Sequence, residues 1–353
     1  MSASWGTKVR YTLFGESHGT AIGIIIDGLP AGIEIDWDFI QSEMARRAPG
    51  GELSTRRQEP DQVEIQSGIY NNKTTGAPLA ARIVNQNQRS SDYGNLAQSF
   101  RPSHGDYGGW VKFDGFNDPR GGGPFSGRLT APIVFAGAII KKLLEREEIT
   151  IGAHLEQIGK VTERRFDSAD NKKTLASLTQ SAFPLLQPKR EESMKGEIIT
   201  VRDIGDSVGG VIEAMALGIP AGKGDLFFGS VESRLSQLLF SIPAVKGLEF
   251  GSGFGLTSMR GSEANDPWII NDKQVQTQSN HNGGILGGLT TGMPLICRVA
   301  VKPTSSIFLP QQTVNTKLEP CELLIQGRHD PCIVPRALPV VEAIMALAIW
   351  DIL

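Results

Sequence analysis

The sequence is short of cysteine, of long apolar runs and of net charge, and each shortage excludes a class of protein. The 353 residues include three cysteines, Cys297, Cys321 and Cys332, which form no C-x-x-C pair and leave one thiol over. This pattern favours a reducing compartment over a disulfide framework and indicates no structural metal. No apolar run approaches the roughly 20 residues that span a bilayer, and residues 1–10 lack the apolar core of a signal peptide. We therefore expect a cytoplasmic protein with no membrane partner.

The chain also lacks a large excess of either positive or negative charge. The 35 basic and 38 acidic residues leave a net charge of -3 and are spread along the chain, so no global field attracts nucleic acid. Any site for an anion must therefore be local. The length allows one large domain or two. Because no Gly/Ser-rich or Pro-rich linker divides the chain, we expect a single domain over residues 1–353.

Glycine, in contrast, is abundant at 41 residues, above the usual share of about 7%, and two glycine-rich stretches repeat. GESHG at 15–19 and GLPAG at 28–32 have the same spacing as GDSVG at 205–209 and GIPAG at 218–222. This predicts one supersecondary unit used twice about a pseudo-two-fold axis. His18 of the first unit is Val208 in the second, so the scaffold does not need an imidazole there. The histidine then serves a site, the alternative being a surface position that has drifted.

Strands and helices are mixed throughout, which predicts the α+β class. Residues 86–127 show no clear pattern, and an irregular stretch of that length is uncommon unless it is functional. It holds Arg101, His104 and Asp106, and we interpret it as the active-site segment. We expect strands at 21–26, 63–67, 79–85 and 149–158, and helices at 38–47, 130–148, 225–240 and 338–353, with a polar helical stretch ending near 181.

Histidine and arginine gather in loops. Four of the five histidines, His18, His104, His281 and His329, stand beside Gly, Ser, Asn or Pro, which favours contact with a ligand over a core position. In GRHDPC at 327–332, arginine is suited to bind phosphate or carboxylate, and the neighbouring carboxylate can hold a proton acceptor in place. The alternative is an Arg–Asp pair that braces a turn.

Three stretches, two of them glycine-rich, have the composition of ligand loops. GGGPFSGR at 121–128 opens a helix, so its amides and Arg128 are suited to receive an anion; it is no Walker loop, because no Gly-Lys-Ser/Thr follows. NHNGGILGG at 280–288 and KPTSS at 302–306 supply amides, hydroxyls and a cation suited to a flavin phosphate. The glycines at 251–255 lack the Rossmann spacing.

Together these motifs closely resemble chorismate synthase, in the family's order and over nearly the whole chain. The resemblance implies conversion of 5-enolpyruvylshikimate 3-phosphate to chorismate by anti-1,4-elimination of phosphate, a lyase reaction and the last common step of the shikimate pathway. It also implies a requirement for reduced FMN without net redox change. The motifs are GESHG at 15–19, RPSHGD at 101–106, GGGPFSGR at 121–128, NHNGGILGG at 280–288, KPTSS at 302–306 and GRHDPC at 327–332.

The resemblance also assigns residues. It implies that His18 acts near the departing phosphate, that His104 protonates the reduced flavin near N1, and that Asp330 assists at N5. The implied substrate-binding residues are Ser17, Arg46, Arg47, Arg56, Arg57, Arg101, Ser126, Arg128 and Arg328. The implied FMN-binding residues are Pro124, Phe125, Ser126, Pro243, Ala244, Gly287, Lys302, Pro303, Thr304, Ser305, Ser306 and Arg328.

Two stretches depart from the family pattern. Pro124, Phe125 and Gly127 occupy positions where many members have Arg, Ser and Ala, so a contact made there by an arginine side chain is not assumed. An arginine often found after residue 49 is aligned here with Leu53, and Arg56 and Arg57 are the candidates to replace it.

The resemblance implies a single β-α-β sandwich domain with internal pseudo-symmetry, assembled as a homotetramer. A second hypothesis is an NAD(P)H-dependent flavin reductase, alone or as an added activity of the same site. NADPH would be a cofactor only if that activity is present. Without it, we expect an external flavin reductase as a partner. A third is a non-catalytic flavin-binding protein, which could dispense with His18, His104 and Asp330, yet all three are present.

Overall fold

The computed structural model describes residues 3–50, 61–86, 98–167, 169–271, 273–325 and 329–353. Leu53, Arg56, Arg57 and Arg328 lie outside these ranges.

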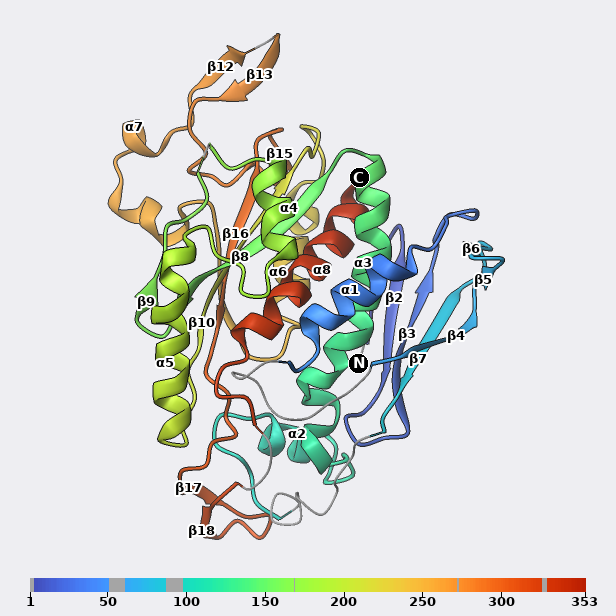
Figure 1. Ribbon diagram of the computed structural model, residues 1–353, viewed down its shortest axis with the longest axis vertical. Coiled ribbons are helices and arrows are strands. Elements are labelled where there is room, and N and C mark those ends of the chain that lie inside the picture. The colour runs from blue at the N-terminus through green and yellow to red at the C-terminus, as the bar shows by residue number, and fades with distance from the viewer. Residues whose placement is uncertain (1–2, 51–60, 87–97, 168, 272, 326–328) are drawn as a thin grey trace.

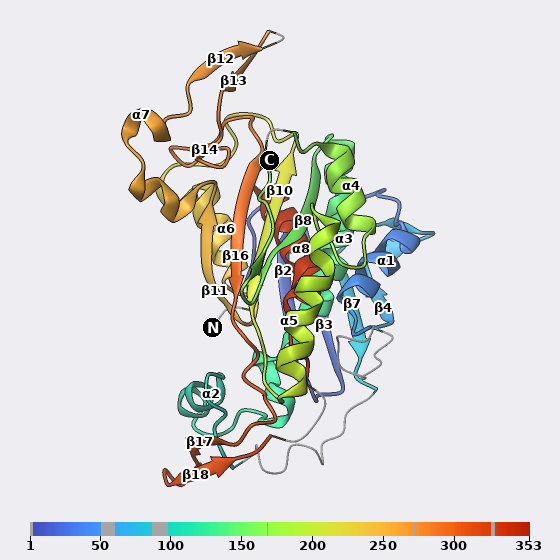
Figure 2. The ribbon, with the colours of Figure 1, turned by 60° about the vertical axis from the view of Figure 1, so that its left-hand side comes forward.

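Two five-stranded antiparallel sheets form the outer layers, with helices between them (Figures 1 and 2). In strand β3, Ile22, Ile24 and Ile26 are buried, whereas Ile25, on the opposite face of the sheet, is exposed. Because side chains alternate along a strand, this pattern identifies the face of the sheet that packs against the helices. The first sheet has the order β1-β2-β3-β7-β4, with β1 Ser4–Trp5, β2 Arg10–Gly15, β3 Ala21–Asp27, β4 Val63–Ser67 and β7 Leu79–Val84. The second has the order β11-β16-β10-β8-β9, with β8 Thr150–Ile158, β9 Val161–Thr162, β10 Gly210–Leu217, β11 Val245–Phe250 and β16 Leu295–Val301.

The middle layer consists of α1 (Trp37–Arg47), α3 (Thr130–Arg146), α6 (Val231–Leu239) and α8 (Val334–Ile352); α1 packs on α3, and α6 packs on α8. Helices α3 and α8 are apolar on nearly all sides, as expected of helices with no solvent face. They pack directly against each other, and Gly137 of α3 permits the approach, because a Cβ there would lie 2.3 Å from the Cβ of Ala343. This arrangement confirms the α+β class.

Smaller elements surround these layers. Helix α4 covers part of the outer face of the second sheet, where Leu175 and Leu178 cluster with Met215, and α5 packs along the β8–β9 edge (Figure 2). The β12–β13 and β17–β18 hairpins project from opposite ends of the molecule (Figure 1). The remaining helices are α2 Asp106–Lys112, α4 Lys172–Gln180, α5 Glu191–Asp203 and α7 Gly261–Ala264. The hairpins pair β5 Ile69–Tyr70 with β6 Lys73–Thr74, β12 Trp268–Asn271 with β13 Gln274–Thr277, β14 Ile285–Leu286 with β15 Leu289–Thr290, and β17 Gln311–Val314 with β18 Pro320–Leu323.

The two GxPAG turns are held in the same way. The amide of Gly32 donates to the carbonyl of Thr74 at 2.8 Å, and Thr74 Oγ1 donates to Pro30 O at 2.7 Å. In the second turn, Gly222 N donates to Thr290 O at 2.8 Å, and the Thr290 hydroxyl donates to Pro220 O at 2.6 Å. The strand orders also correspond: β2-β3-β7-β4 in one sheet matches β8-β10-β16-β11 in the other.

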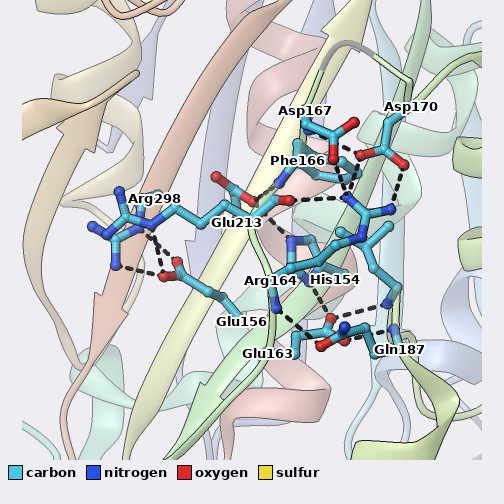
Figure 3. Close-up of polar contacts among 12 residues, drawn as sticks. His154, Glu156, Glu163, Arg164, Phe166, Asp167, Asp170, Gln187, Glu213 and Arg298 are labelled. Carbon is cyan, nitrogen blue, oxygen red and sulfur yellow. Dashed lines mark hydrogen bonds and ion pairs between the residues drawn. The ribbon is translucent and has the colours of Figure 1, made fainter.

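A buried charged row crosses the second sheet on the side that faces α4 (Figure 3). His154 and Arg298 stand opposite Glu213 on the two neighbouring strands. His154 Nε2 lies 2.8 Å from Glu213 Oε2, and its Nδ1 lies 2.5 Å from Glu163 Oε1. Arg298 forms two hydrogen bonds to Glu156, at 2.6 and 2.7 Å. Each buried charge in the row therefore has an opposite partner, as a low-dielectric setting demands.

Most expected elements are confirmed, and the exceptions have local reasons. The stretch 86–127 contains helix α2, which its glycine pair at 108–109 conceals because glycine lowers helix propensity. The helix expected at 225–240 begins only at Val231, where the Ser230 side chain accepts the Ser233 amide as an N-cap. The helix expected at 338–353 begins four residues earlier. No helix in the described part of the chain is long and apolar enough to cross a membrane.

Candidate active site

A cavity of about 800 Å³ opens between loops of the N-terminal and C-terminal parts of the chain. One wall comes from Ser17, the loops around Arg101 and residues 121–128, and Arg47 at the end of α1. The other wall comes from residues 240–246 and 302–306, and the start of α8 closes it. The volume is that of a site for one or two small ligands.

The cavity gathers most of the site residues expected from the sequence. His18 is buried just behind its wall, with Nδ1 3.2 Å from Ser17 Oγ. Among the expected residues, the ones that line the cavity are Ser17, Arg47, Arg101, His104, Pro124, Phe125, Ser126, Arg128, Pro243, Ala244, Lys302, Pro303, Thr304, Ser305, Ser306 and Asp330.

Two expected residues lie elsewhere. The guanidinium of Arg46 forms ion pairs with Glu43 at 2.7 Å and with Glu342 of α8 at 2.6 Å. Lys141 also pairs with Glu342, so these side chains form a charged cluster within the middle layer. Burial opposes ionisation of Glu342, but Lys141 and Arg46 lower its pKa to about 2. Gly287 is in the β14–β15 turn and is not among the lining residues. A substrate role of Arg46 and an FMN contact of Gly287 are therefore not supported by this cavity.

The arginines of the cavity are paired with carboxylates. Asp61, a buried residue just before β4, forms ion pairs with both Arg47 and Arg128. Burial raises the pKa of Asp61, but the two guanidinium groups outweigh it and lower the pKa below its ordinary value. Arg336 of α8 forms an ion pair with Asp330 and donates from Nε to the carbonyl of Arg47 at 3.0 Å. These three arginines and two carboxylates carry a net charge of about +1 when ionised, so the group attracts a further anion.

A second cluster holds His104. Nδ1 of the ring lies 2.5 Å from Asp106 Oδ1. Arg101 binds the same carboxylate with two donors, Nε to Oδ2 at 2.7 Å and Nη2 to Oδ1 at 2.8 Å. Burial raises the pKa of Asp106, but the hydrogen bonds from Arg101 and His104 lower it well below its ordinary range.

The three glycines at 121–123 let the loop pass close to both histidines. All three have positive φ, at 58°, 89° and 50°, a conformation that glycine adopts readily and other residues rarely. A Cβ on Gly121 would lie 2.1 Å from His18 Cε1, and one on Gly122 would lie 3.2 Å from His104 Nε2. Larger residues at these positions would therefore displace the two imidazoles.

Comparisons with known proteins bear directly on this site. A family model described as "Chorismate synthase" matches residues 9–353. The chain belongs to the chorismate synthase family. It is 45% identical over 347 residues to "Chorismate synthase" of Thermococcus kodakarensis, covering 98% of this chain and 96% of that one. It is 46% identical over 354 residues to the protein of the same name from Dehalococcoides mccartyi, covering 100% and 96%.

A solved structure agrees with these relatives. The fold matches one titled "Crystal Structure of Chorismate Synthase" with a TM-score of 0.76 and 29% identity, over 99% of this chain and 92% of that chain. As a member of the chorismate synthase family, the chain is an enzyme, a lyase of class EC 4.2.3.5.

The cavity fits the flavin that the chorismate synthase family uses. An isoalloxazine ring needs an apolar wall, which Phe125, Ile242 and Pro243 provide, and its phosphate needs donors, which the 302–306 loop supplies as an ammonium group and hydroxyls. Lys302 Nζ donates to both the carbonyl and the hydroxyl of Ser103, which joins this loop to the one that carries His104. The donors and the apolar wall therefore face one space.

Two residues that shape the site were missed in the sequence: Arg336, which lines the cavity, and Asp61, which pairs with two of its arginines. Asp61 follows a charged stretch and precedes a strand, and no motif marks it; Arg336 was noted only as following GRHDPC. Asp61 pairs with residues 14 and 67 positions away, and Arg336 donates to the carbonyl of Arg47, 289 positions away. The proline at 335 could have indicated that Arg336 begins a helix directed at the site.

Proposed function

We propose that this enzyme catalyses the anti-1,4-elimination of phosphate from 5-enolpyruvylshikimate 3-phosphate, giving chorismate, with reduced FMN and no net redox change. The observation that carries the proposal is one cavity lined by arginines, by His104 and Asp330, and by the hydroxyl-rich 302–306 loop. A site with both an anion-binding group and a flavin-sized apolar wall suits a reaction that needs both. The step is the last common one of the shikimate pathway to the aromatic amino acids.

The arginines suit this substrate, which carries a phosphate and two carboxylates. Arg47 and Arg128 face the cavity from the end of α1 and from the turn before α3, and both are nearly buried. Arg47 Nε finds no acceptor among the described residues, and an unpaired buried donor is costly. A ligand oxygen would satisfy it. Substrate roles for Arg46, Arg56, Arg57 and Arg328 stay predictions from the family resemblance.

The protein groups would hold or move protons at defined places. His18, behind Ser17 and Gly121, would neutralise charge as phosphate leaves; Ser17 and Ser126 would orient the substrate by hydrogen bonds. His104 Nε2 would protonate the reduced flavin near N1, and Asp330 would assist near N5. Bound reduced FMN supplies transient electron transfer to the substrate and accepts its hydrogen. Lys302, Thr304, Ser305 and Ser306 would bind the flavin phosphate.

The proposal extends to architecture and assembly. The matched turns and strand orders support an internal duplication about a pseudo-two-fold axis, with the single domain spanning residues 1–353. Homotetramer assembly is supported by apolar side chains that one chain leaves exposed: Ile270 of the β12–β13 hairpin is 82% exposed, and Phe227 and Phe228 are 84% and 97% exposed. A cytoplasmic location remains a prediction.

The test is an anaerobic assay of phosphate and chorismate release from 5-enolpyruvylshikimate 3-phosphate. One arm contains photoreduced FMN, and the other contains oxidised FMN and NADPH. Product in the first arm alone supports a monofunctional enzyme that depends on an external flavin reductase. Product in both arms adds an intrinsic reductase, and no product in either arm contradicts the proposal.

A further inference from the structure

We propose that Asp106, clamped by Arg101, is a positioning residue that fixes the tautomer and orientation of His104, so that Nε2 is the ring nitrogen offered to the cavity. The inference rests on the proposed function for its role in catalysis. It adds Asp106 to the machinery and gives Arg101 a task other than direct binding of the substrate.

The proton on His104 is located by its partners. An ionised carboxylate can only accept hydrogen bonds, and Asp106 is held in its ionised form by the bidentate guanidinium of Arg101. The 2.5 Å contact between Asp106 Oδ1 and His104 Nδ1 therefore requires a hydrogen on Nδ1. Within the described residues Nε2 has no hydrogen-bond partner. In the neutral ring Nε2 is thus the acceptor, and in the imidazolium it is a second donor.

The guanidinium of Arg101 is engaged in holding the Asp106 carboxylate. Besides the two side-chain bonds, its backbone amide donates to Asp106 Oδ2 at 3.1 Å, and the residue is only 6% exposed. Its Nη2 lies 3.1 Å from His104 Nδ1, but two N–H donors cannot bond to each other. Arg101 and His104 therefore share Asp106 Oδ1. A guanidinium fixed at this depth is poorly placed to act as a free counter-ion for the substrate.

The chain around the cluster restrains it further. Ser103 has a positive φ of 60°, and Lys302 binds both its carbonyl and its hydroxyl, which anchors the turn before His104. Asp106 begins α2 and so has a fixed backbone. On the opposite side of the ring, a Cβ on Gly122 would lie 3.2 Å from Cε1 and from Nε2. Pinning a histidine through one nitrogen while the other faces the reactant is a recurring arrangement in acid–base catalysis.

The test compares Asp106→Asn and Asp106→Glu with wild type, using protein that carries ¹⁵N-labelled histidine. Two-bond ¹⁵N–¹H spectra report which nitrogen of His104 bears the proton in the neutral ring. In wild type we expect that proton on Nδ1, which faces the Asp106 carboxylate. In Asp106→Asn we expect a mixture of the two tautomers, because the amide can donate as well as accept a hydrogen bond. Asp106→Glu should restore the wild-type tautomer in part.

Turnover gives a second readout. The Asn variant should lower kcat by roughly ten- to hundred-fold, a part of what a general acid contributes. Arg101→Lys, which cannot form the bidentate pair, should do the same to a smaller degree. Arg120→Lys is the matched control, because Arg120 forms an equally bidentate but exposed pair with Asp118 in the same segment; it should change neither readout.

An unchanged tautomer of His104 in both Asp106→Asn and Arg101→Lys would overturn the inference. So would unchanged kcat in both variants. The NMR measurement needs neither substrate nor flavin, so it separates this inference from the proposed function. Should Asp106→Asn fail to fold by circular dichroism, Arg101→Lys and Asp106→Glu carry the same comparison.

Discussion

At the scale of single residues, the cavity balances arginine against carboxylate. Asp61 shows this most directly, because it is buried and paired with two guanidinium groups that come from different elements. Removing one member of a buried pair leaves uncompensated charge and costs about 3–5 kcal/mol. An anion from solution that occupies the same space would recover part of that loss.

We therefore expect Asp61→Asn to lower the free energy of unfolding by about 3–5 kcal/mol in buffer free of phosphate and sulfate. Inorganic phosphate should then raise the stability of the variant more than that of wild type. Urea unfolding with and without phosphate measures both effects. Glu64→Gln, which breaks the exposed pair with Arg82, is the control and should change stability by less than about 1 kcal/mol. A variant as stable as wild type, with no differential response to phosphate, would contradict this balance.

The motifs predicted the residue types of the site but not their partners. His104, Arg128 and Asp330 stand in glycine-rich loops whose sequence already indicates ligand contact. Asp61 and Arg336 lack such a signal, since Asp61 pairs with Arg47 and Arg128, and Arg336 bonds to the carbonyl of Arg47. Sequence spacing does not encode such long-range pairing.

His154 carries the clearest pH dependence. Burial lowers the pKa of its imidazole, but hydrogen bonds to Glu163 and Glu213 outweigh burial and raise the pKa above its ordinary value. Because the folded-state pKa is the higher one, the stability from this cation is fully present below the unfolded value of about 6.5. It is lost as the pH rises through the folded value.

The measurement is ¹⁵N NMR of His154 combined with urea unfolding from pH 6 to pH 9. We expect both ring nitrogens to be protonated at pH 7 and the free energy of unfolding to decline at higher pH, in step with release of the His154 proton. A neutral imidazole at pH 7 would contradict the assignment of charge to this cluster (Figure 3).

At the scale of elements, the crossing of α3 and α8 sets the middle layer and hence the position of the cavity at its end. Gly137 lies so close to α8 that a Cβ would be 2.3 Å from the Cβ and 2.6 Å from the Cα of Ala343. The apolar runs of both helices predicted their burial, but the sequence did not show which glycine marks the crossing.

Gly137→Ala should destabilise the fold by about 1–3 kcal/mol, because the added methyl group overpacks the helix contact. The matched control is Gly196→Ala in α5, where a Cβ meets nothing within 4 Å; it should stabilise by roughly 0.5–1 kcal/mol through helix propensity. Thermal unfolding of both variants measures the difference. Equal effects of the same sign would show that close packing at Gly137 is not what the position requires.

At the scale of the whole molecule, apolar side chains are unevenly exposed. The β12–β13 hairpin projects from one end of the molecule (Figure 1). Its Ile270 and Val275 are 82% and 63% exposed. If they are covered by other copies of the chain, Ile270→Lys with Val275→Lys should convert tetramers to smaller species in sedimentation velocity. Tyr70→Lys, at the 72% exposed tip of β5, is the control. A wild-type chain that sediments as a monomer at micromolar concentration would contradict the assembly.

The α+β class and most elements followed from hydrophobic pattern and turn residues, whereas the layered sandwich and the family followed from the resemblance carried by six motifs in order. The arrangement of the cavity did not follow from the sequence. It depends on how residues 17–128 and residues 240–340 meet across the cavity, which becomes visible only once both sheets are packed on α3 and α8.

The central claim is that the enzyme uses reduced FMN as a catalyst and does not consume it. The measurement is the number of chorismate and phosphate molecules released per reduced flavin, under anaerobic conditions with substrate in large excess and flavin absorbance followed throughout. We predict equal amounts of the two products, many turnovers per flavin, and flavin that is still reduced at the end. Flavin oxidised in proportion to product, or no chorismate at all, would contradict the account.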